Sequence, residues 1–159
     1  SYTGLRIGTS LAKGICYAAD LPLISISTLR AIAWGSRITL MAGEHIVSMI
    51  DARRMEVYCQ SFSQSLVPSS DVEAVIVEAQ SFANLLDKGK TYFVGNGAAK
   101  CRPMLTHINA IFPSEVQCSA FHMGTLAAEK FSAETFEDLA GFTPLYLKEF
   151  IAKKAKPLF

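Results

Sequence analysis

The spacing of apolar and polar residues predicts an amphipathic helix at the start of the chain. From Thr3 to Ala19 small and apolar residues recur with helical spacing, and Pro22 follows soon after the expected end. When residues are placed at about 100° intervals, the polar ones gather on one face. An ordinary surface helix has an apolar stripe of about 100°, and this stripe is roughly twice as wide. We therefore expect the helix to pack against two partners.

The apolar surface of this helix has two parts of different shape. Ile7, Leu11 and Ile15 form a ridge of branched side chains. The other part is smoother, and another helix backbone can approach it closely because its side chains are small. Its residues are Gly8, Ala12, Cys16 and Ala19.

The pattern after this helix predicts a strand, a short helix and an antiparallel meander. The run LISIS, residues 23–27, is rich in apolar, β-branched residues, as in a strand covered on both faces. Ser27 is expected to cap, through its side-chain oxygen, a short helix that runs to about Trp34. The runs HIVSMID, MEVYCQSFS and VEAVIVE are strand-like, so residues 45–78 are predicted to form the meander.

Helices and strands alternate in the remaining sequence. We expect a helix at about Ser81 to Leu86, a strand in TYFVG, a helix after GNG, a short strand in EVQCS and a helix at about Phe121 to Phe131. Three antiparallel strands followed by alternating helices and strands suit an α/β lobe of the ribonuclease H-like type, whose mixed sheet carries helices on its faces.

Composition and charge narrow the classes of function. Half of the 159 residues are apolar, which suits one core or two small lobes. A formal net charge of +1 gives no global electrostatic reason to bind nucleic acid or an anionic membrane. The four cysteines are widely spaced without a C-x-x-C pair, which favours reduced thiols of a cytoplasmic protein. Asp20 and Pro22 interrupt the most apolar stretch, so we expect a soluble protein without a membrane span.

Four motifs resemble those of the TsaB family, also called YeaZ. SYTGLRIGTSLAKGICYAADLPLISISTL resembles the family's G-P-G-S-[FY]-T-G-[LV]-R-[IV]-G helix and the strand after it. DARRMEVY resembles the family's DAR-x-x-EVY hairpin, GNGAAK its G-x-G after a strand, and PLYLKE its P-x-YL[RK] ending. The motifs follow the family's order over nearly the whole chain, and the first two are the more specific. The family's GPG and the elements before it are absent from this sequence.

This resemblance implies the actin-like ATPase fold, an α/β fold of two ribonuclease H-like lobes. Residues 1–36 are then expected to be the remnant of an N-terminal lobe, so that the first lobe is incomplete and the second complete. Residues 37–147 correspond to the C-terminal lobe, and residues 148–159 to a basic tail. The lysines of that tail can contact tRNA phosphates, or they are simply solvated.

The resemblance also implies a function. TsaB-like proteins are regarded as non-catalytic paralogues of TsaD, and they act with TsaD and the small ATPase TsaE to place a threonylcarbamoyl group on adenosine 37 of tRNA. We therefore expect a cytoplasmic subunit that binds and activates a TsaD-like protein. A TsaE-like ATPase is a further partner, a homodimer is an alternative assembly, and tRNA is reached only through the complex. The chain alone is expected to bind no cofactor, although the complex uses ATP.

Family members pair through a helix bundle of their first lobes, which implies that the opening helix carries the partner interface. The alternative is that both apolar parts of the helix are covered within a complete lobe. The expected interface residues are Gly4, Leu5, Gly8, Ala12 and Cys16.

The other motif residues are candidates for ligand contact or for a structural role. In DARR, an acid beside two guanidinium groups can hold a phosphate or a partner carboxylate; the alternative, which we favour, is a turn stabilised by Asp51. The glycines of FVGNGAAK would let a phosphate approach, as in a nucleotide-binding ATPase, but they also serve any tight turn, which we favour. The full set is Thr3, Arg6, Asp51, Arg53, Glu56, Tyr58, Gly95, Gly97 and Tyr146.

A metallopeptidase is the second enzymatic alternative, because the broad family has been labelled a glycoprotease or M22 peptidase. The only histidines are His45, His107 and His122, and none has a histidine at i+4 as an H-E-x-x-H site requires. We therefore expect no metal site, and the resemblance implies that this chain carries no catalytic residues.

Overall fold

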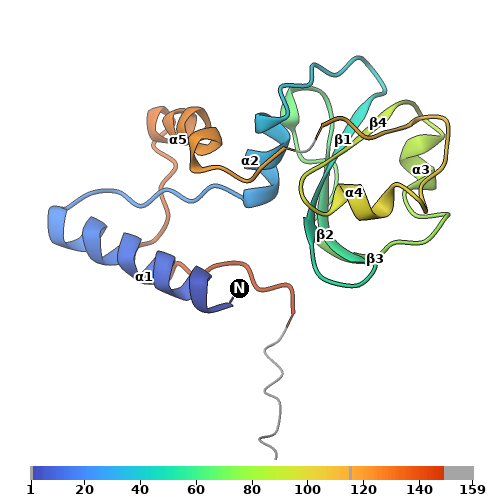
Figure 1. Cartoon of the computed structure of the whole chain (residues 1–159). Coiled ribbons are helices and arrows are strands. Elements are labelled where there is room, and N and C mark those ends of the chain that lie inside the picture. The colour runs from blue at the N-terminus through green and yellow to red at the C-terminus, as the bar shows by residue number, and fades with distance from the viewer. Residues whose placement is uncertain (1, 115, 149–159) are drawn as a thin grey trace, which may run out of the picture.

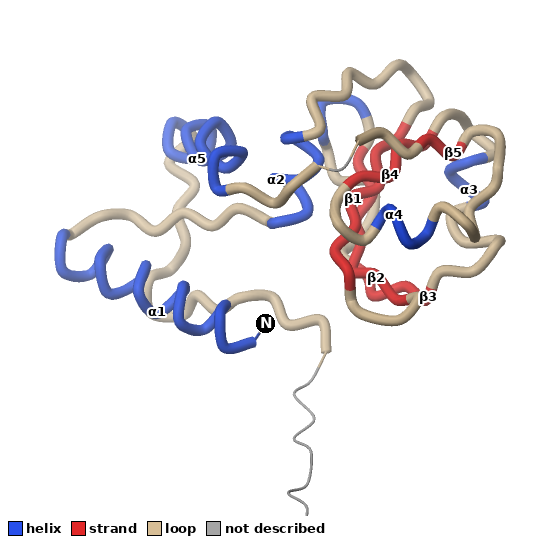
Figure 2. Tube along the Cα trace, viewed as in Figure 1, coloured by secondary structure: helices blue, strands red, loops and turns tan. Residues whose placement is uncertain are grey.

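A five-stranded mixed sheet forms one part of the fold, and the helices α1, α2 and α5 lie to one side of it (Figures 1 and 2). The structure is a computed structural model that describes residues 2–114 and 116–148. The order of the strands is β3-β2-β1-β4-β5. Strands β1 to β3 are antiparallel neighbours, whereas β4 runs parallel to β1 and β5 parallel to β4.

The predicted meander and the strand in TYFVG are confirmed. The hairpin pairs Ile46 with Phe62 at one end and Asp51 with Val57 at the other. The strands are β1 (His45–Asp51), β2 (Glu56–Phe62), β3 (Glu73–Ile76), β4 (Thr91–Val94) and β5 (Ala110–Ile111).

The predicted helices are also present. A short 3-10 turn, η2 (Ala120–His122), leads into α5, and another, η1 (Gln64–Leu66), follows β2. The α-helices are α1 (Tyr2–Ala19), α2 (Thr28–Gly35), α3 (Ala83–Leu86), α4 (Ala98–Cys101) and α5 (Met123–Ser132).

Three local predictions are wrong. LISIS is not a strand: only Leu23 pairs, in an isolated antiparallel bridge with Glu137, because no described neighbouring strand runs beside the rest of the segment. The side chain of Ser27 makes no capping hydrogen bond, and its carbonyl accepts from the Ala31 amide instead (2.9 Å). In EVQCS, Glu115 lies outside the described residues, and residues 116–119 form no strand.

The two faces of the sheet carry separate apolar clusters. Val47 and Met49 of β1 pack on the face that α3 and α4 cover, together with Phe93. Ile46 packs on the opposite face with Ile32 of α2 and with other apolar side chains. Strand β1 therefore reads as a nearly continuous apolar run because both of its faces are covered.

Helix α1 is peripheral to these clusters. From Thr3 to Ala19 no side chain is buried, and Figure 1 shows the helix beside the C-terminal segment, away from the sheet. Within residues 2–114 and 116–148, no helix combines the length and the apolar character needed to cross a bilayer. The domain boundaries expected after residues 36 and 147 stay predictions, and the tail from residue 149 lies outside the described part of the chain.

Candidate functional site: an exposed helix face and a polar hairpin cluster

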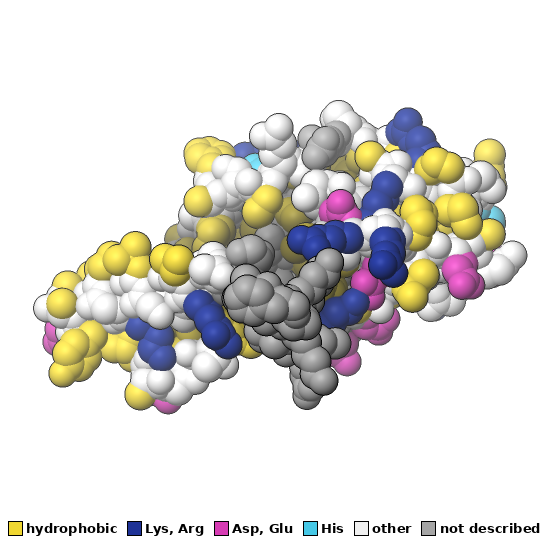
Figure 3. All heavy atoms as spheres, turned by 60° about the horizontal axis from the view of Figure 1, so that its bottom comes forward, with side chains coloured by type: hydrophobic (Ala, Val, Ile, Leu, Met, Phe, Trp, Pro, Cys, Tyr) yellow, Lys and Arg dark blue, Asp and Glu magenta, His cyan; other side chains and the backbone are white. Residues whose placement is uncertain are grey.

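Helix α1 exposes a row of large apolar side chains. The exposed fractions are 46% for Leu5, 63% for Ile7 and Leu11, and 54% for Ile15. Figure 3 shows apolar side chains along the protruding part of the molecule that α1 forms. Single exposed apolar residues are ordinary, but a contiguous apolar patch marks an interaction surface.

The smaller residues of the predicted interface lie next to this row. Gly4 is exposed, while Ala12 and Cys16 are half-buried. At Gly8, an added Cβ would meet no described atom within 4 Å. We call the apolar side of α1, from Gly4 and Leu5 through Ile7, Gly8, Leu11, Ala12, Ile15 and Cys16, the α1 face. Its open space at Gly8 lets a second helix come close.

The C-terminal segment contacts α1 through Lys13 and Arg6, which lie on the polar side of the helix. Lys13 Nζ donates to the carbonyl oxygens of Ala140 (2.8 Å) and Phe142 (3.1 Å). The guanidinium of Arg6 lies 6.0 Å from the centre of the Tyr146 ring, at the outer limit of a cation–π contact. Between Thr3 and Ala19 the half-buried residues are Thr9, Ala12, Lys13 and Cys16, whereas the large apolar side chains of Leu5, Ile7, Leu11 and Ile15 stay exposed. Thr3 is exposed.

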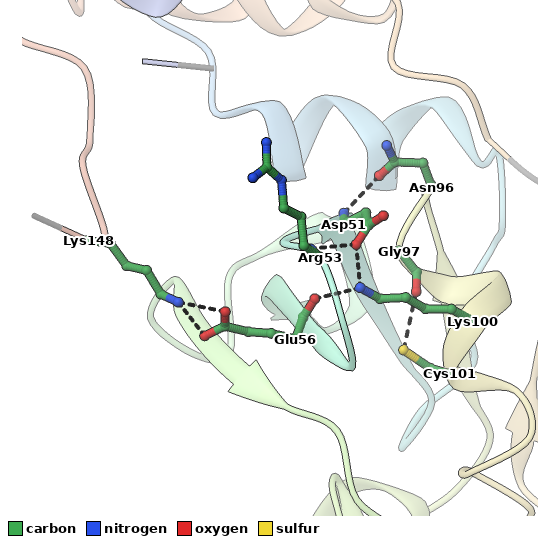
Figure 4. Close-up of polar contacts among 8 residues, drawn as sticks. All are labelled: Asp51, Arg53, Glu56, Asn96, Gly97, Lys100, Cys101 and Lys148. Atoms are coloured by element: carbon green, nitrogen blue, oxygen red, sulfur yellow. Dashed lines mark hydrogen bonds and ion pairs between the residues drawn. The ribbon is translucent and has the colours of Figure 1, made fainter. Parts of the chain in front are cut away.

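The second candidate site is a polar cluster at the tip of the β1–β2 hairpin, which Figure 4 shows. Asp51 ends β1, and its Oδ1 accepts a hydrogen bond from the Arg53 amide (2.8 Å). The Asp51 amide in turn donates to Asn96 Oδ1 (3.0 Å). Lys100 of α4 pairs with the Asp51 carboxylate and donates to the Glu56 carbonyl oxygen (2.7 Å). We call Asp51, Arg53, Glu56, Asn96 and Lys100 the hairpin cluster.

The charge of Asp51 is satisfied within the protein. The hydrogen bond from Lys100, followed by that from the Arg53 amide, lowers the pKa of the Asp51 carboxyl below its ordinary value. The guanidinium of Arg53 points away from this carboxylate (Figure 4). The geometry supports a turn stabilised by Asp51, because the acid binds Lys100 and the turn backbone and is not joined to Arg53 in a guanidinium–carboxylate site.

Glu56 links the hairpin cluster to the C-terminal segment. Lys148 Nζ lies 2.6 Å from Glu56 Oε1 and 2.5 Å from Oε2. This contact with Glu56 raises the pKa of Lys148. Tyr58 lies two residues further along β2 than Glu56 and is half-buried, opposite Ile50 and Ala74. Sequence reasoning missed Asn96, Lys100 and Lys148 as contacts of the hairpin, since nothing in their spacing indicates which strand they reach.

The two glycines of GNG let the turn after β4 lie directly against β1. Gly95 has a φ of +97°, and a Cβ added there would lie 2.3 Å from the Met49 carbonyl oxygen. A Cβ at Gly97 would lie 3.0 Å from the Ile50 carbonyl carbon, and the Gly97 amide donates to the Met49 carbonyl oxygen (3.2 Å). These glycines are therefore explained by close backbone packing without a bound phosphate.

Within the described residues, the side chains suited to metal binding occur at most in pairs. His107 Nε2 is 3.8 Å from Asp87 Oδ1. At His45, burial and, as a smaller cause, the charge of Lys88 lower the pKa of the imidazole. Burial raises the pKa of the Cys59 thiol to about 12. In the described part of the chain, no three or more His, Cys, Asp or Glu side chains are grouped so that they could hold a metal ion.

Comparison with known proteins gives consistent matches. The sequence matches the family model described as TsaD: tRNA N6-adenosine threonylcarbamoyltransferase over residues 1–158. It is 28% identical over 166 residues to the tRNA threonylcarbamoyladenosine biosynthesis protein TsaB of Haemophilus influenzae, covering 99% of this chain and 70% of that protein. A protein of the same name from Escherichia coli is 38% identical over 64 residues, which are 40% of this chain and 27% of that protein.

Two solved structures share the fold. One is described as an uncharacterized protein with similarity to peptidase YEAZ from Pseudomonas aeruginosa, with a TM-score of 0.69 and 20% identity over 93% of this chain and 69% of that chain. The other is YeaZ from Pseudomonas aeruginosa, with a TM-score of 0.68 and 19% identity over 92% of this chain and 70% of that chain. The predicted fold class, an α/β fold of the actin-like, ribonuclease H-like type, is confirmed.

Proposed function

Because the chain belongs to the TsaD family, and its relatives there are TsaB and YeaZ proteins, we propose that it is a non-catalytic subunit in the synthesis of threonylcarbamoyladenosine at position 37 of tRNA. In this proposal the chain binds a TsaD-like protein through the α1 face and activates it. The catalytic residues belong to that partner. The relatives' names support the pathway, and the exposure of Leu5, Ile7, Leu11 and Ile15 on the α1 face supports the mode of action.

The exposed apolar row on α1 is the observation that carries this proposal. Leu5, Ile7, Leu11 and Ile15 are each close to half exposed or more. Burying such a row against a partner removes apolar surface from water, which stabilises the complex by about 25 cal/mol per Å² of buried surface. The open space at Gly8 lets the partner helix approach closely enough to bury the row.

The remaining parts of the proposal concern the assembly. A TsaE-like ATPase joins the complex, which uses ATP, and the chain alone holds no cofactor. The chain contacts tRNA only through the complex. The complex lies in the cytoplasm and does not bind a membrane. A homodimer formed through the same α1 face is the alternative assembly when no TsaD-like partner is present.

Adding bulk to the α1 face tests the proposed interface. We expect Gly8→Leu in the full-length protein to weaken the affinity for a TsaD-like protein by about tenfold or more, since overpacking a helix contact costs about 1–3 kcal/mol. The helix itself should persist, because an added Cβ at Gly8 meets no described atom within 4 Å. Isothermal titration calorimetry measures the affinity, and circular dichroism follows the fold.

Ser10→Leu is the matched control. Ser10 is also exposed on α1 but belongs to its polar side, so the same side chain is added away from the α1 face. It should bind the partner as the unmodified chain does. Equal affinity of Gly8→Leu and the unmodified protein would contradict the interface assignment.

A further inference from the structure

The segment from Asp138 to Lys148 connects α1 with the hairpin cluster. It follows α5 and the Glu137 bridge, runs beside α1 (Figure 1) and reaches Glu56 of β2 through Lys148 (Figure 4). We call residues 138–148 the strap.

The first end of the strap is shaped to bind α1. The Asp138 carboxylate accepts hydrogen bonds from the amides of Ala140 (3.2 Å) and Gly141 (2.9 Å), and the Phe142 amide donates to the Asp138 carbonyl oxygen (2.8 Å). This tight turn directs the carbonyl oxygens of Ala140 and Phe142 to one ammonium group, Lys13 Nζ. One lysine of α1 thus holds two successive parts of the strap.

The second end of the strap is bound to the sheet. Lys148 pairs with both carboxylate oxygens of Glu56, whose side chain is 20% exposed. The carbonyl oxygen of the same residue accepts from Lys100, and Lys100 pairs with Asp51. A continuous series of polar contacts therefore runs from α1 through the strap to β1, β2 and α4.

Packing alone does not hold α1 in place. None of its side chains from Thr3 to Ala19 is buried, so no apolar core fixes the angle between this helix and the sheet. The side chains of Lys13 and Arg6 both reach from α1 to the strap. The Leu23–Glu137 bridge holds the segment after α1 at the start of the strap, so the position of the rest of the helix depends on where the strap is held.

We propose that the strap is a positioning device: its Lys148–Glu56 anchor sets the angle between α1 and the sheet and so presents the α1 face. The link to partner docking rests on the proposed function, whereas the effect on the angle does not. A partly exposed ion pair changes an equilibrium by up to about fivefold. Breaking the anchor therefore broadens the range of α1 positions without unfolding the sheet.

Distance measurements in the full-length protein test this proposal. Spin labels carried by a noncanonical amino acid at Ala18 of α1 and Ile76 of β3, both exposed, leave the native cysteines unlabelled. Pulsed electron paramagnetic resonance should give a narrow distance distribution for the unmodified chain and a broader one for Lys148→Glu. Exchanging the charges, with Glu56→Lys and Lys148→Glu together, should restore the narrow distribution. Lys90→Glu, at an exposed lysine outside the strap, should have no effect.

The results separate the strap from the proposed function. An unchanged distance distribution in Lys148→Glu, or no recovery after the charge exchange, would contradict the proposal that the strap positions α1. Affinity for the TsaD-like protein should fall by about fivefold in Lys148→Glu and recover in the exchanged variant. An unchanged affinity despite a broadened distribution would overturn the link to docking. If the unmodified protein binds no TsaD-like partner, the proposed function is wrong. The distance distributions still test whether the strap positions α1.

Discussion

Gly95 shows how one residue joins the two halves of the hairpin cluster. Its φ of +97° lets the turn after β4 lie against the Met49 carbonyl of β1. That close approach brings the Asn96 side chain to the Asp51 amide and places Lys100, one turn later, beside the Asp51 carboxylate. The glycine spacing that resembles a phosphate-binding loop is thus accounted for by contacts within the chain.

Substitution of Gly95 tests this explanation. We expect Gly95→Ala to lower the free energy of unfolding by about 2–4 kcal/mol, because a left-handed backbone and a close contact with a backbone oxygen are both unfavourable for alanine. Urea denaturation measures the change. Gly14→Ala is the control, because its added Cβ meets no described atom within 4 Å. Alanine is more favourable than glycine in a helix interior by about 0.5–1 kcal/mol, so this variant should not be destabilised. A Gly95→Ala chain as stable as the unmodified protein would show that the turn is not closely packed.

Residue contacts of this kind could be predicted from the sequence only in part. The sequence favoured a turn stabilised by Asp51 because aspartate commonly binds the backbone two residues later, as the Arg53 amide contact bears out. Lys100 is far from Asp51 in sequence, and Lys148 is far from Glu56. Their pairing depends on the strand order β2-β1-β4 and on the path of the strap, which local spacing does not encode.

At the scale of elements, Glu137 joins the segment after α1, helix α5 and the start of the strap. Its carboxylate accepts from Ser25 Oγ (2.5 Å) and pairs with Lys130 of α5 (3.3 Å). Its amide donates to the Leu23 carbonyl oxygen (2.8 Å), within the isolated bridge. The hydrogen bond from Ser25 is the main cause that lowers the pKa of Glu137.

This lowered pKa gives a pH dependence of defined sign. A carboxyl whose pKa is lower in the folded state stabilises that state above its ordinary pKa of 4.5, and the contribution is lost as the pH falls through the lowered value. We expect Glu137→Gln to lower the free energy of unfolding by about 1 kcal/mol at neutral pH. The difference between the two chains should shrink below pH 4.5. Urea denaturation over a series of pH values measures it, and a difference that stays constant with pH would contradict the role of the charge.

Long patterns gave the clearest predictions, although the four-residue elements β4, α3 and α4 were also predicted. Helix α1 has several turns of consistent spacing, and β1 and β2 are each seven residues long. The two-residue strand β5 is too short to show an alternation. LISIS has the composition of a buried strand, yet composition does not supply the neighbouring strand that the hydrogen bonds require.

At the scale of the whole molecule, the strap runs beside α1 (Figure 1) and joins this helix to the sheet, and Leu5, Ile7, Leu11 and Ile15 of the α1 face are exposed. Hydrophobic patterning predicted a helix with too wide an apolar surface for one partner, but it could not say what the partner is. The motifs supplied that hypothesis, because function depends on a site and a partner more than on a fold. The central claim is therefore that the chain acts as a non-catalytic partner of a TsaD-like enzyme.

Reconstitution of the modification tests this claim most directly. The full-length protein, a TsaD-like protein, a TsaE-like ATPase, ATP, a threonylcarbamoyl donor and unmodified tRNA are combined, and threonylcarbamoyladenosine is measured by mass spectrometry of the digested tRNA. We expect modification in the complete mixture, its loss when the chain is omitted or replaced by Gly8→Leu, and none with the chain as the only protein. Equal modification without the chain, or modification by the chain alone, would contradict the account.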